Sequence, residues 1–290
     1  MTEISKMSKP PLLSACNFKI FDEPFIYGFV DNYLPSDLYD QLAGEFANVT
    51  VANQSRKLEF GKNYVSYQAG ESIDGIESAS PLWADTVRTL SSKPYIKDCE
   101  QWARPFLRRA RGVSALRRWR NWPEERPSFA DWSIQFGCEW SSLLRDTWLP
   151  PHTDRISKFL SFVLYFPSSN WRTEWGGGTE VYKPLDGKFN RNWSNFRLPR
   201  SFMELVFDSG FVANRLFFFV KSQNSWHGVS PLHCPPEMQR RTFNFNIEIS
   251  TSFRETIANR LEEKIYHKIE SPLYRSLFKT QGRDPIFGGE

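Results

Sequence analysis

A His-x-Asp triplet, followed far along the chain by another histidine, is the feature that most constrains this sequence. His152 and Asp154 follow two prolines, and His227 follows a second apolar segment. If His152 and Asp154 lie at the mouth of a strand, their side chains share one side, because strand side chains repeat with period two. The distant His227 can then complete a three-ligand set. Two imidazoles and one carboxylate suit non-haem Fe(II), whereas structural zinc prefers four protein ligands.

A short triplet alone is weak evidence for a metal site, because such triplets recur by chance. The apolar segments that follow it strengthen the prediction, since they indicate strands of one β domain. Residues 158–166 form an unbroken run of β-branched and aromatic residues, which indicates a buried strand. A glycine turn leads into a short strand within 174–182, and another apolar strand covers 215–220. Residues 240–247 alternate polar and apolar, which is typical of a strand packed on one face.

The segment before the triplet is predicted to form two more strands, at residues 132–136 and 141–145. The second of them leads the chain to His152. Arg145 and Trp148 come shortly before the triplet. Both are candidates to face the substrate. Core packing is the favoured role for Trp148, and for Arg145 neither outcome is favoured.

This order of motifs resembles the core of the iron(II)/2-oxoglutarate-dependent dioxygenases, in particular their prolyl-hydroxylase-like branch, over roughly residues 130–250. The resemblance implies a double-stranded β-helix, a jelly-roll or cupin-like barrel of two sheets whose open end holds the metal. It implies His152, Asp154 and His227 as the ligands of Fe(II). It also implies 2-oxoglutarate and O2 as co-substrates, with succinate and CO2 as products.

The same resemblance calls for a basic residue after the second histidine that holds the distal carboxylate of 2-oxoglutarate. Arg240 and Arg241 both qualify by position. Alternation separates them, because Arg241 shares a face with Phe243 and Phe245, and that apolar face should pack outward against helices. Arg240 therefore points into the barrel, where its guanidinium can bind a carboxylate in bidentate geometry. Two arginines on a solvated edge are the alternative.

Alternation also predicts the other inward residues of these strands. Thr242 lies beside Arg240 and could add a hydrogen bond to the co-substrate, and Asn244 and Asn246 follow on the same face. On the strand at 158–166 the inward residues are Ser161, Val163 and Tyr165. Tyr165 matches the family position whose hydroxyl helps to bind the co-substrate.

The rest of the chain is predicted to support an α+β arrangement around a mainly β core. Residues 1–16 are expected to be a disordered lead, 17–128 a supporting region of helices and strands, 129–250 the barrel, and 251–290 a helix and tail.

Within the supporting region, strands are expected at 18–21 and 25–30, and a helix from Ser36 to Phe46 with Ser36 as its cap. Residues 49–80 are rich in Ser, Gly, Asn and Gln and are predicted to form a long loop that covers the site. Helices are predicted at 81–90 and 94–103.

The C-terminal helix is expected to carry an apolar stripe of Ile257, Leu261 and Ile265.

The composition of the chain limits the cellular environment and the binding partners that can be expected. The net charge of +4 and pI near 8.8 are mildly basic and do not by themselves demand nucleic acid. Four cysteines without a Cys-x-x-Cys pair are read as reduced thiols of a cytoplasmic protein. No apolar run has the length of a membrane helix, so no membrane partner is expected.

The most basic stretch runs from Arg104 to Arg126 and includes two tryptophans. A basic run with aromatic residues can bind nucleic acid. A solvated helix face that pairs with nearby acidic residues is the favoured interpretation, so nucleic acid is not expected as a partner.

The sequence thus predicts a dioxygenase that hydroxylates an unactivated C–H bond of a protein side chain, an amino acid or a small metabolite. The retained Asp154 argues against halogenation, because halogenating relatives replace this carboxylate with a small residue. An inactive barrel that serves as a binding module and a nucleic-acid-modifying dioxygenase that uses the basic stretch remain the alternatives.

Overall fold

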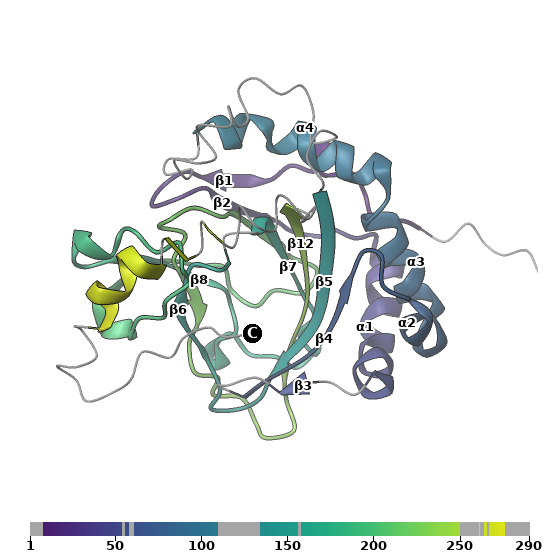
Figure 1. The fold of residues 1–290 in the computed structure, drawn as a ribbon. Helices are drawn as coiled ribbons and strands as arrows, with labels where there is room; N and C mark the ends of the chain where they lie inside the picture. Colours follow the sequence, from purple (N-terminus) through teal and green to yellow (C-terminus); the bar gives the residue numbers. More distant parts are fainter. Residues whose placement is uncertain are drawn as a thin grey trace, which may run out of the picture.

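Two antiparallel sheets, one large and one small, form the centre of the molecule (Figure 1). The computed structural model describes residues 8–53, 56–57, 61–109, 134–155, 158–249, 261, 264–265 and 267–275. The large sheet has the strand order β1-β2-β10-β7-β12-β5-β4-β3, and the small sheet has the order β6-β11-β8-β9.

The bounds of the elements are as follows. The large sheet comprises β1 (Lys19–Phe21), β2 (Tyr27–Val30), β3 (Arg56–Lys57), β4 (Lys62–Gln68), β5 (Ile134–Leu143), β7 (Lys158–Tyr165), β10 (Leu216–Val220) and β12 (Arg240–Ile249). The small sheet comprises β6 (Leu149–His152), β8 (Glu180–Pro184), β9 (Met203–Asp208) and β11 (His227–Val229). The α-helices of the supporting region are α1 (Ser36–Ala52), α2 (Asp74–Ala79), α3 (Pro81–Leu90) and α4 (Lys93–Arg109).

The order in which the chain visits the two sheets defines the barrel. The strands β5, β7, β10 and β12 lie in the large sheet, while β6, β8, β9 and β11 lie in the small one. The chain therefore crosses between the sheets repeatedly as it runs from β5 to β12, as in a jelly roll. This topology confirms the predicted mainly β class with a double-stranded β-helix core and flanking helices.

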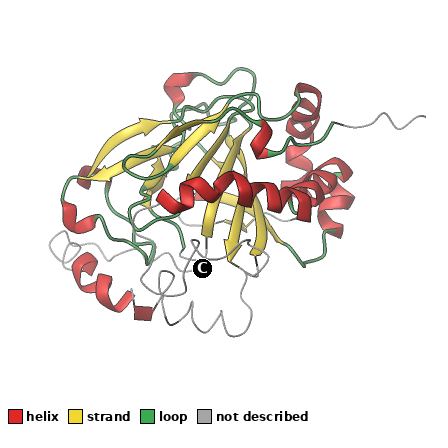
Figure 2. Cartoon of the chain, turned by 90° about the horizontal axis from the view of Figure 1, so that it is seen from above, coloured by secondary structure: helices red, strands yellow, loops and turns green. Residues whose placement is uncertain are grey.

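The outward face of the large sheet packs against the helices, as the alternation of β12 predicts. Phe243, Phe245 and Ile247 are almost fully buried on this face. The ring of Trp83, on α3, lies 4.9 Å from that of Phe243, and the ring of Trp102, on α4, lies 4.8 Å from that of Phe218. Figure 2 shows the long helix α4 lying across the strands. Apolar contacts therefore occupy one face of the sheet and leave its other face for the barrel interior.

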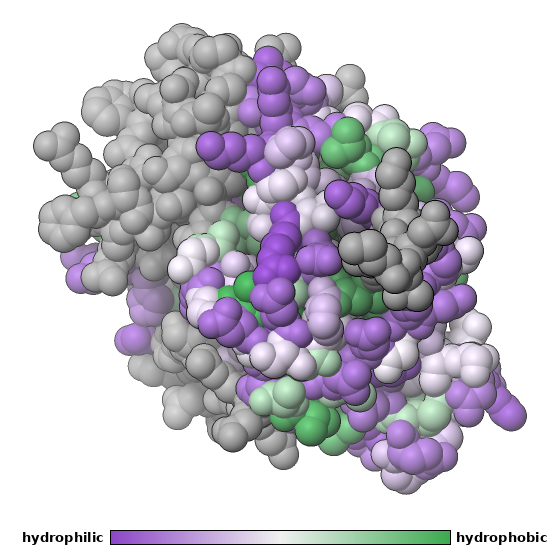
Figure 3. Space-filling view, turned by 90° about the vertical axis from the view of Figure 1, so that its right-hand side faces the viewer, coloured by the Kyte–Doolittle hydropathy of each residue, from purple (hydrophilic) through white to green (hydrophobic). Residues whose placement is uncertain are grey.

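Helix α3 begins where its sequence predicts. Ser80 is its N-cap, with the Oγ accepting a hydrogen bond from the backbone N–H of Trp83, and Pro81 stands in the first turn. The side of the molecule that carries α1, α2 and α3 presents mainly hydrophilic residues, with small hydrophobic patches between them (Figure 3).

Several predicted boundaries were wrong. The predicted long loop at 49–80 contains the end of α1, the strands β3 and β4, and helix α2. The two strands predicted at 132–136 and 141–145 are one strand, β5, because its backbone pairs continuously with β12 from Ile134 to Leu143.

Helix α1 extends to Ala52, beyond the predicted end at Phe46, and its N-cap is Pro35, so Ser36 is its first residue instead of the predicted cap. Helix α4 likewise extends past 103, to Arg109.

The two ends of the chain also differ from the predictions. In the predicted disordered lead, the described residues include a short 3-10 helix at Leu13–Ala15, and Leu13 is completely buried. At the other end, Leu261 and Ile265 are about half exposed, and among the described residues of the C-terminal helix Tyr274 packs into a core cluster, with the partly buried Leu273 against it. Ile257 lies outside the described residues.

All four cysteines are free thiols, as predicted. Within the part of the chain that the structure describes, no helix has both the length and the apolar character that crossing a membrane requires.

Candidate metal centre

The pairing of β6 with β11 places the two predicted histidine ligands side by side. His152 is the last residue of β6, and it lies directly opposite His227, the first residue of β11. Side chains of directly opposed residues on antiparallel strands are close neighbours. The two imidazole rings have centroids 4.3 Å apart.

Backbone carbonyls orient both imidazoles in the same way. The Nδ1 of His152 is 2.9 Å from the carbonyl oxygen of Pro150, and the Nδ1 of His227 is 2.9 Å from that of Ser225. Because a carbonyl only accepts, each Nδ1 carries the hydrogen and donates it. Each Nε2 therefore has a free lone pair directed at Asp154, which is the arrangement of metal-binding histidines.

Asp154 reaches the histidines through a turn instead of through strand alternation. β6 ends at His152, and Asp154 has a positive φ of 67°. Aspartate is among the few residues that tolerate this left-handed conformation. The prediction that both side chains share a strand face was therefore wrong, although the turn brings the carboxylate to the same place.

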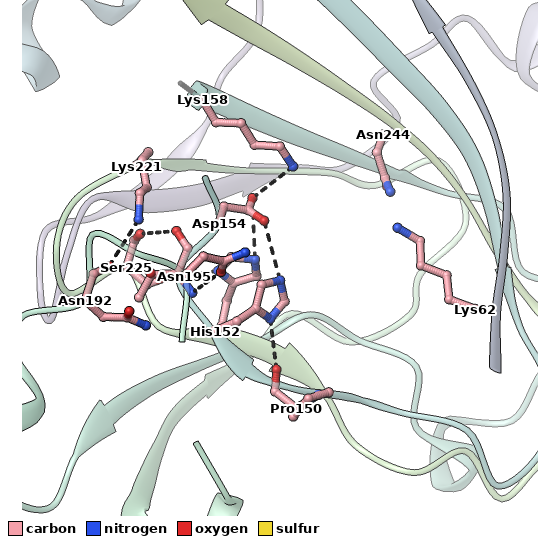
Figure 4. A network of polar contacts seen from close by, with 12 residues as sticks. Lys62, Pro150, His152, Asp154, Lys158, Asn192, Asn195, Lys221, Ser225 and Asn244 are labelled. Atoms are coloured by element: carbon pink, nitrogen blue, oxygen red, sulfur yellow. Dashed lines mark hydrogen bonds and ion pairs between the residues drawn. The ribbon is translucent and has the colours of Figure 1, made fainter. Parts of the chain in front are cut away.

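Hydrogen bonds from Thr153 and its partners hold this turn, and Figure 4 shows Asn192, Asn195 and Ser225 beside Asp154 and His152. The buried Thr153 hydroxyl donates to the carbonyl of Asn192, and its backbone N–H donates to the side-chain oxygen of Asn195. The Ser225 hydroxyl donates to the Thr153 carbonyl. The turn between His152 and Asp154 is thus tied to the segment that precedes His227.

The donor set fits one divalent cation. His152 Nε2 lies 3.5 Å from Asp154 Oδ1, and His227 Nε2 lies 3.8 Å from Asp154 Oδ2. Two ligands that are each about 2.1 Å from a metal lie about 3 to 4 Å apart. One ligand atom from each of the three residues falls within 4.8 Å of the others. Three nitrogen and oxygen donors on one side of a cavity, with the other side open, suit a metal that also binds exogenous ligands.

Lys158, at the start of β7, forms an ion pair with this carboxylate. Its Nζ lies 3.3 Å from Asp154 Oδ2. Burial opposes both charges, but the pairing outweighs it, so the pKa of Asp154 is well below its usual value and that of Lys158 is raised. The carboxylate is therefore ionised and held in place before any metal binds.

Burial keeps His227 neutral. It lowers the pKa of His227 to about 3, and the neighbouring His152 contributes in the same direction. A neutral imidazole is the form that binds a metal, so this residue is ready as a ligand at neutral pH.

The triad lines a cavity of about 110 Å³ between the two sheets, and Arg240 lines it as well. Arg240 is only 3% exposed, and burial lowers its pKa. Its Nε donates to the carbonyl of Gly177, at 2.6 Å. Gly177 has a φ of 104°, which only glycine adopts without strain, so the glycine run brings this carbonyl to the arginine.

The charge of Arg240 is suited to binding an anion. Among the described residues no carboxylate lies within ion-pair distance of it, although Tyr165 and Asp208 act on it electrostatically, and a buried cation without a close counter-ion is unfavourable. A carboxylate group of a ligand would supply the missing charge in a geometry that a guanidinium matches.

The neighbouring arginine lies on the other face of β12. The Arg241 guanidinium is 5.7 Å from the ring centre of Phe46 on α1. The predicted separation of Arg240 and Arg241 by alternation is confirmed.

Tyr165 and Thr242, which the sequence predicts as co-substrate-binding residues, are both fully buried, and neither is among the residues that line the cavity. The Tyr165 hydroxyl is 2.7 Å from the hydroxyls of both Thr179 and Ser209, and its ring centre is 5.6 Å from the Arg240 guanidinium. Thr242 is fully buried and exchanges a hydrogen bond with Ser141 at 2.9 Å. The ring of Tyr165 therefore lies against the Arg240 guanidinium and helps to hold it in place.

Three charged residues of the cavity wall were not predicted: Lys62, Glu139 and Lys158. Glu139 and Ser141 both point inward from β5, and this period-two pattern was a signal in the sequence that could have identified Glu139. Lys62 had no such signal, because its strand lies in the segment that was predicted to be a loop.

Other predicted candidates lie away from the cavity. Arg145 pairs with Asp146 at the surface, and Trp148 is 38% exposed instead of buried in the core. Arg104 pairs with Glu100 at 3.2 Å, and residues 110–126 of the basic stretch lie outside the described residues.

Comparison with known proteins supports the oxygenase interpretation for the core. Residues 141–248 match the family model of the 2OG-Fe(II) oxygenase superfamily, and this range includes every predicted site residue. The predicted Fe(II) and 2-oxoglutarate are the cofactors after which that superfamily is named. No curated protein matches the chain.

Solved structures of such enzymes are similar to the chain at low identity. A prolyl-4-hydroxylase from Pseudomonas putida has a TM-score of 0.42 at 14% identity, with 78% of this chain and 93% of that chain covered. HygX from Streptomyces hygroscopicus, with nickel and 2-oxoglutarate bound, has a TM-score of 0.44 at 10% identity, with coverage of 77% and 83%. The carbocyclase SnoK from nogalamycin biosynthesis has a TM-score of 0.47 at 10% identity, with coverage of 77% and 79%. At these identities their substrates say nothing about the substrate of this chain.

The lowered pKa of His227 predicts that the metal-free protein loses stability in mild acid. The unfolded chain takes up a proton at this residue below pH 6.5, whereas the folded chain does not until about pH 3. The contribution of the neutral His227 to the free energy of unfolding is therefore complete above pH 6.5. It decreases as the pH falls, by at most about 2 kcal/mol at pH 5. Urea unfolding at pH 7.5 and pH 5 measures it, and His227→Gln should show a smaller decrease. An equal decrease in both proteins would contradict the assignment.

The Lys158–Asp154 pair predicts a second stability effect. Lys158→Met leaves the Asp154 carboxylate without its ion pair in a largely buried position, which should lower the free energy of unfolding of the metal-free protein by about 1–3 kcal/mol. Lys188→Met, which removes the exposed pair with Asp186, is the matched control and should have almost no effect. Urea unfolding of both variants at pH 7.5 compares them. An equal decrease in the free energy of unfolding would show that burial of the Lys158–Asp154 pair does not affect its contribution to stability.

Proposed function

We propose that this protein is an Fe(II)- and 2-oxoglutarate-dependent dioxygenase that hydroxylates an unactivated C–H bond of its substrate. One observation carries the proposal: His152, Asp154 and His227 converge on a cavity that also contains the buried guanidinium of Arg240, which has no ion pair among the described residues. A metal-ligand set and an anion anchor in one cavity match the two groups that such an enzyme binds.

Each residue has a role that follows from its contacts. His152, Asp154 and His227 would hold Fe(II), and Arg240 would hold the distal carboxylate of 2-oxoglutarate. When bound, these groups supply the oxidising chemistry, in which O2 converts 2-oxoglutarate to succinate and CO2 and one oxygen atom is inserted into a substrate C–H bond. Lys158 would keep Asp154 oriented, and Tyr165 would keep the Arg240 side chain in place. The buried walls limit access of water.

Hydroxylation and a place in the prolyl-hydroxylase-like branch are part of the same proposal. The order of the sequence motifs supports the branch. The retained carboxylate of Asp154 supports hydroxylation over halogenation, because it occupies the position that a halide would need.

The ligand assignment predicts that each of His152→Ala, Asp154→Ala and His227→Ala abolishes Fe(II) binding. Succinate release from 2-oxoglutarate in the presence of O2 should fall by more than about 100-fold, since loss of even the hydrogen-bond partners of metal ligands costs 10–100-fold. Metal content and succinate are measured for each variant. His233→Ala changes an exposed histidine six residues from His227 and should retain both properties. Full activity in the His227 variant would refute the assignment.

The alternation of β12 predicts different effects for its two arginines. Arg240→Ala leaves the distal carboxylate unpaired in a buried site, which should cost roughly 2–5 kcal/mol of binding and raise the KM for 2-oxoglutarate about thirty-fold or more. Arg241→Ala removes a side chain on the opposite face, beside Phe46, and should leave this KM almost unchanged. Steady-state kinetics of both variants, with a melting curve to exclude unfolding, tests this difference. The reverse order of effects would show that the anchor is Arg241.

A further inference from the structure

A polar cluster on the wall of the large sheet is made of residues other than the candidate metal ligands and Arg240. It consists of Lys62 on β4, Glu139 on β5 and Asn244 on β12, and all three line the cavity. Lys62 Nζ lies 2.6 Å from Glu139 Oε1, and Asn244 Nδ2 donates to the same oxygen at 3.0 Å. Figure 4 shows Lys62 and Asn244 converging on the side of the cavity opposite Asp154 and His152.

Fold stability does not account for this cluster. The side chains of Lys62 and Glu139 are only 15% and 21% exposed, so forming the pair requires substantial desolvation. The pair is not needed to attach β4 to β5, because the two strands are already paired along the backbone from Lys62 to Gln68. A packed apolar wall would serve the barrel equally well.

The wall also contains buried polar atoms that lack a hydrogen-bond partner. Among the described residues these include Ser161 Oγ and Asn244 Oδ1, and both residues line the cavity. Ser161 is 3% exposed and faces Asn246 across the strand pair, one inward position from Asn244. Buried polar atoms without a partner are unfavourable, and in a cavity they indicate that a ligand supplies the missing bonds.

The atoms of the wall define the chemistry of that ligand. Glu139 accepts both of its described contacts on Oε1, and a carboxylate has about four acceptor sites, so it can receive further donors together with Asn244 Oδ1. Lys62 has three donors and Ser161 has one. A ligand that carries an ammonium group next to a carboxylate is complementary to both pairs. Together Lys62, Glu139, Asn244 and Ser161 have no net charge, because Lys62 and Glu139 cancel, and a zwitterion would leave this balance unchanged, whereas an anion or a cation would not.

We propose that Lys62, Glu139, Asn244 and Ser161 recognise the zwitterionic head group of a small α-amino-acid substrate. The ammonium group binds Glu139 and Asn244, and the carboxylate binds Lys62 and Ser161. This inference rests on the proposed function, because it names the substrate class of the same cavity. It makes these residues determinants of substrate specificity that are separate from the metal ligands.

The test measures binding, with no need for turnover. The full-length protein is loaded with Mn(II) and 2-oxoglutarate without O2, and thermal unfolding is followed with each standard free L-α-amino acid and with its N-acetyl amide, which lacks both charges. At least one free amino acid should raise Tm, and its N-acetyl amide should not. The inference is overturned if no free amino acid raises Tm, if the amide acts equally, or if the neutral polyol mannitol does so.

Variants connect the binding to the wall. Glu139→Gln keeps the shape of the side chain but removes its charge, and Lys62→Met removes the ammonium group that pairs with Glu139. Each variant should raise the Kd of that amino acid at least tenfold and leave the Kd of 2-oxoglutarate unchanged. Lys188→Met, in an exposed ion pair, is the control and should leave both values unchanged. An unchanged amino-acid Kd in Glu139→Gln would overturn the inference. Mn(II) and 2-oxoglutarate are titrated in the same samples, so loss of their binding contradicts the proposed function, and loss of amino-acid binding alone contradicts only this inference.

Discussion

The pairing of His152 with His227 across β6 and β11 is the constraint on which the candidate site depends. Two short strands of the small sheet meet at these residues, and carbonyls of each chain segment fix the two rings. The turn that places Asp154 is in turn held by Thr153 and Ser225. A backbone arrangement, more than any single side chain, therefore creates the set of three donors. A shift of one residue in this pairing would move a histidine to the outer face.

The division of the large sheet into two chemically different faces explains how so many charges lie inside the barrel. Aromatic residues such as Phe243 and Phe245 bury the outer face against the helices and provide the packing. The inner face is thus free to carry polar side chains, each of which needs a partner in a poorly solvated space. Lys158 has Asp154 and Lys62 has Glu139, whereas Arg240 has no carboxylate within ion-pair distance among the described residues, although Asp208 acts on it electrostatically. The two ion pairs therefore mark one part of the cavity, and Arg240 marks another.

Local patterns predicted the apolar strands β7, β10 and β12 well, but they divided β5 into two strands and missed β4. The alternation in β12 correctly separated Arg240 from Arg241, because a ten-residue strand with one buried face has a strong periodic signal. The short strands β6 and β11 carry the two candidate histidine ligands but have only four and three residues, which is too few for a period to be visible. The polar segment at 49–80 looked like a loop because β4 faces a polar cavity, so that its inward residues lack the apolar pattern of a strand.

The sequence by itself determined the three candidate ligands, the inward arginine and the mainly β barrel, because each depends on residue type and local periodicity. Only the tertiary structure decided how Asp154 reaches the histidines, since a left-handed turn stabilised by distant residues is not visible in a local pattern. It also decided that Lys62 and Glu139 meet in the cavity. Their contact joins residues far apart in the chain, and its free energy depends on the solvent that the whole fold excludes.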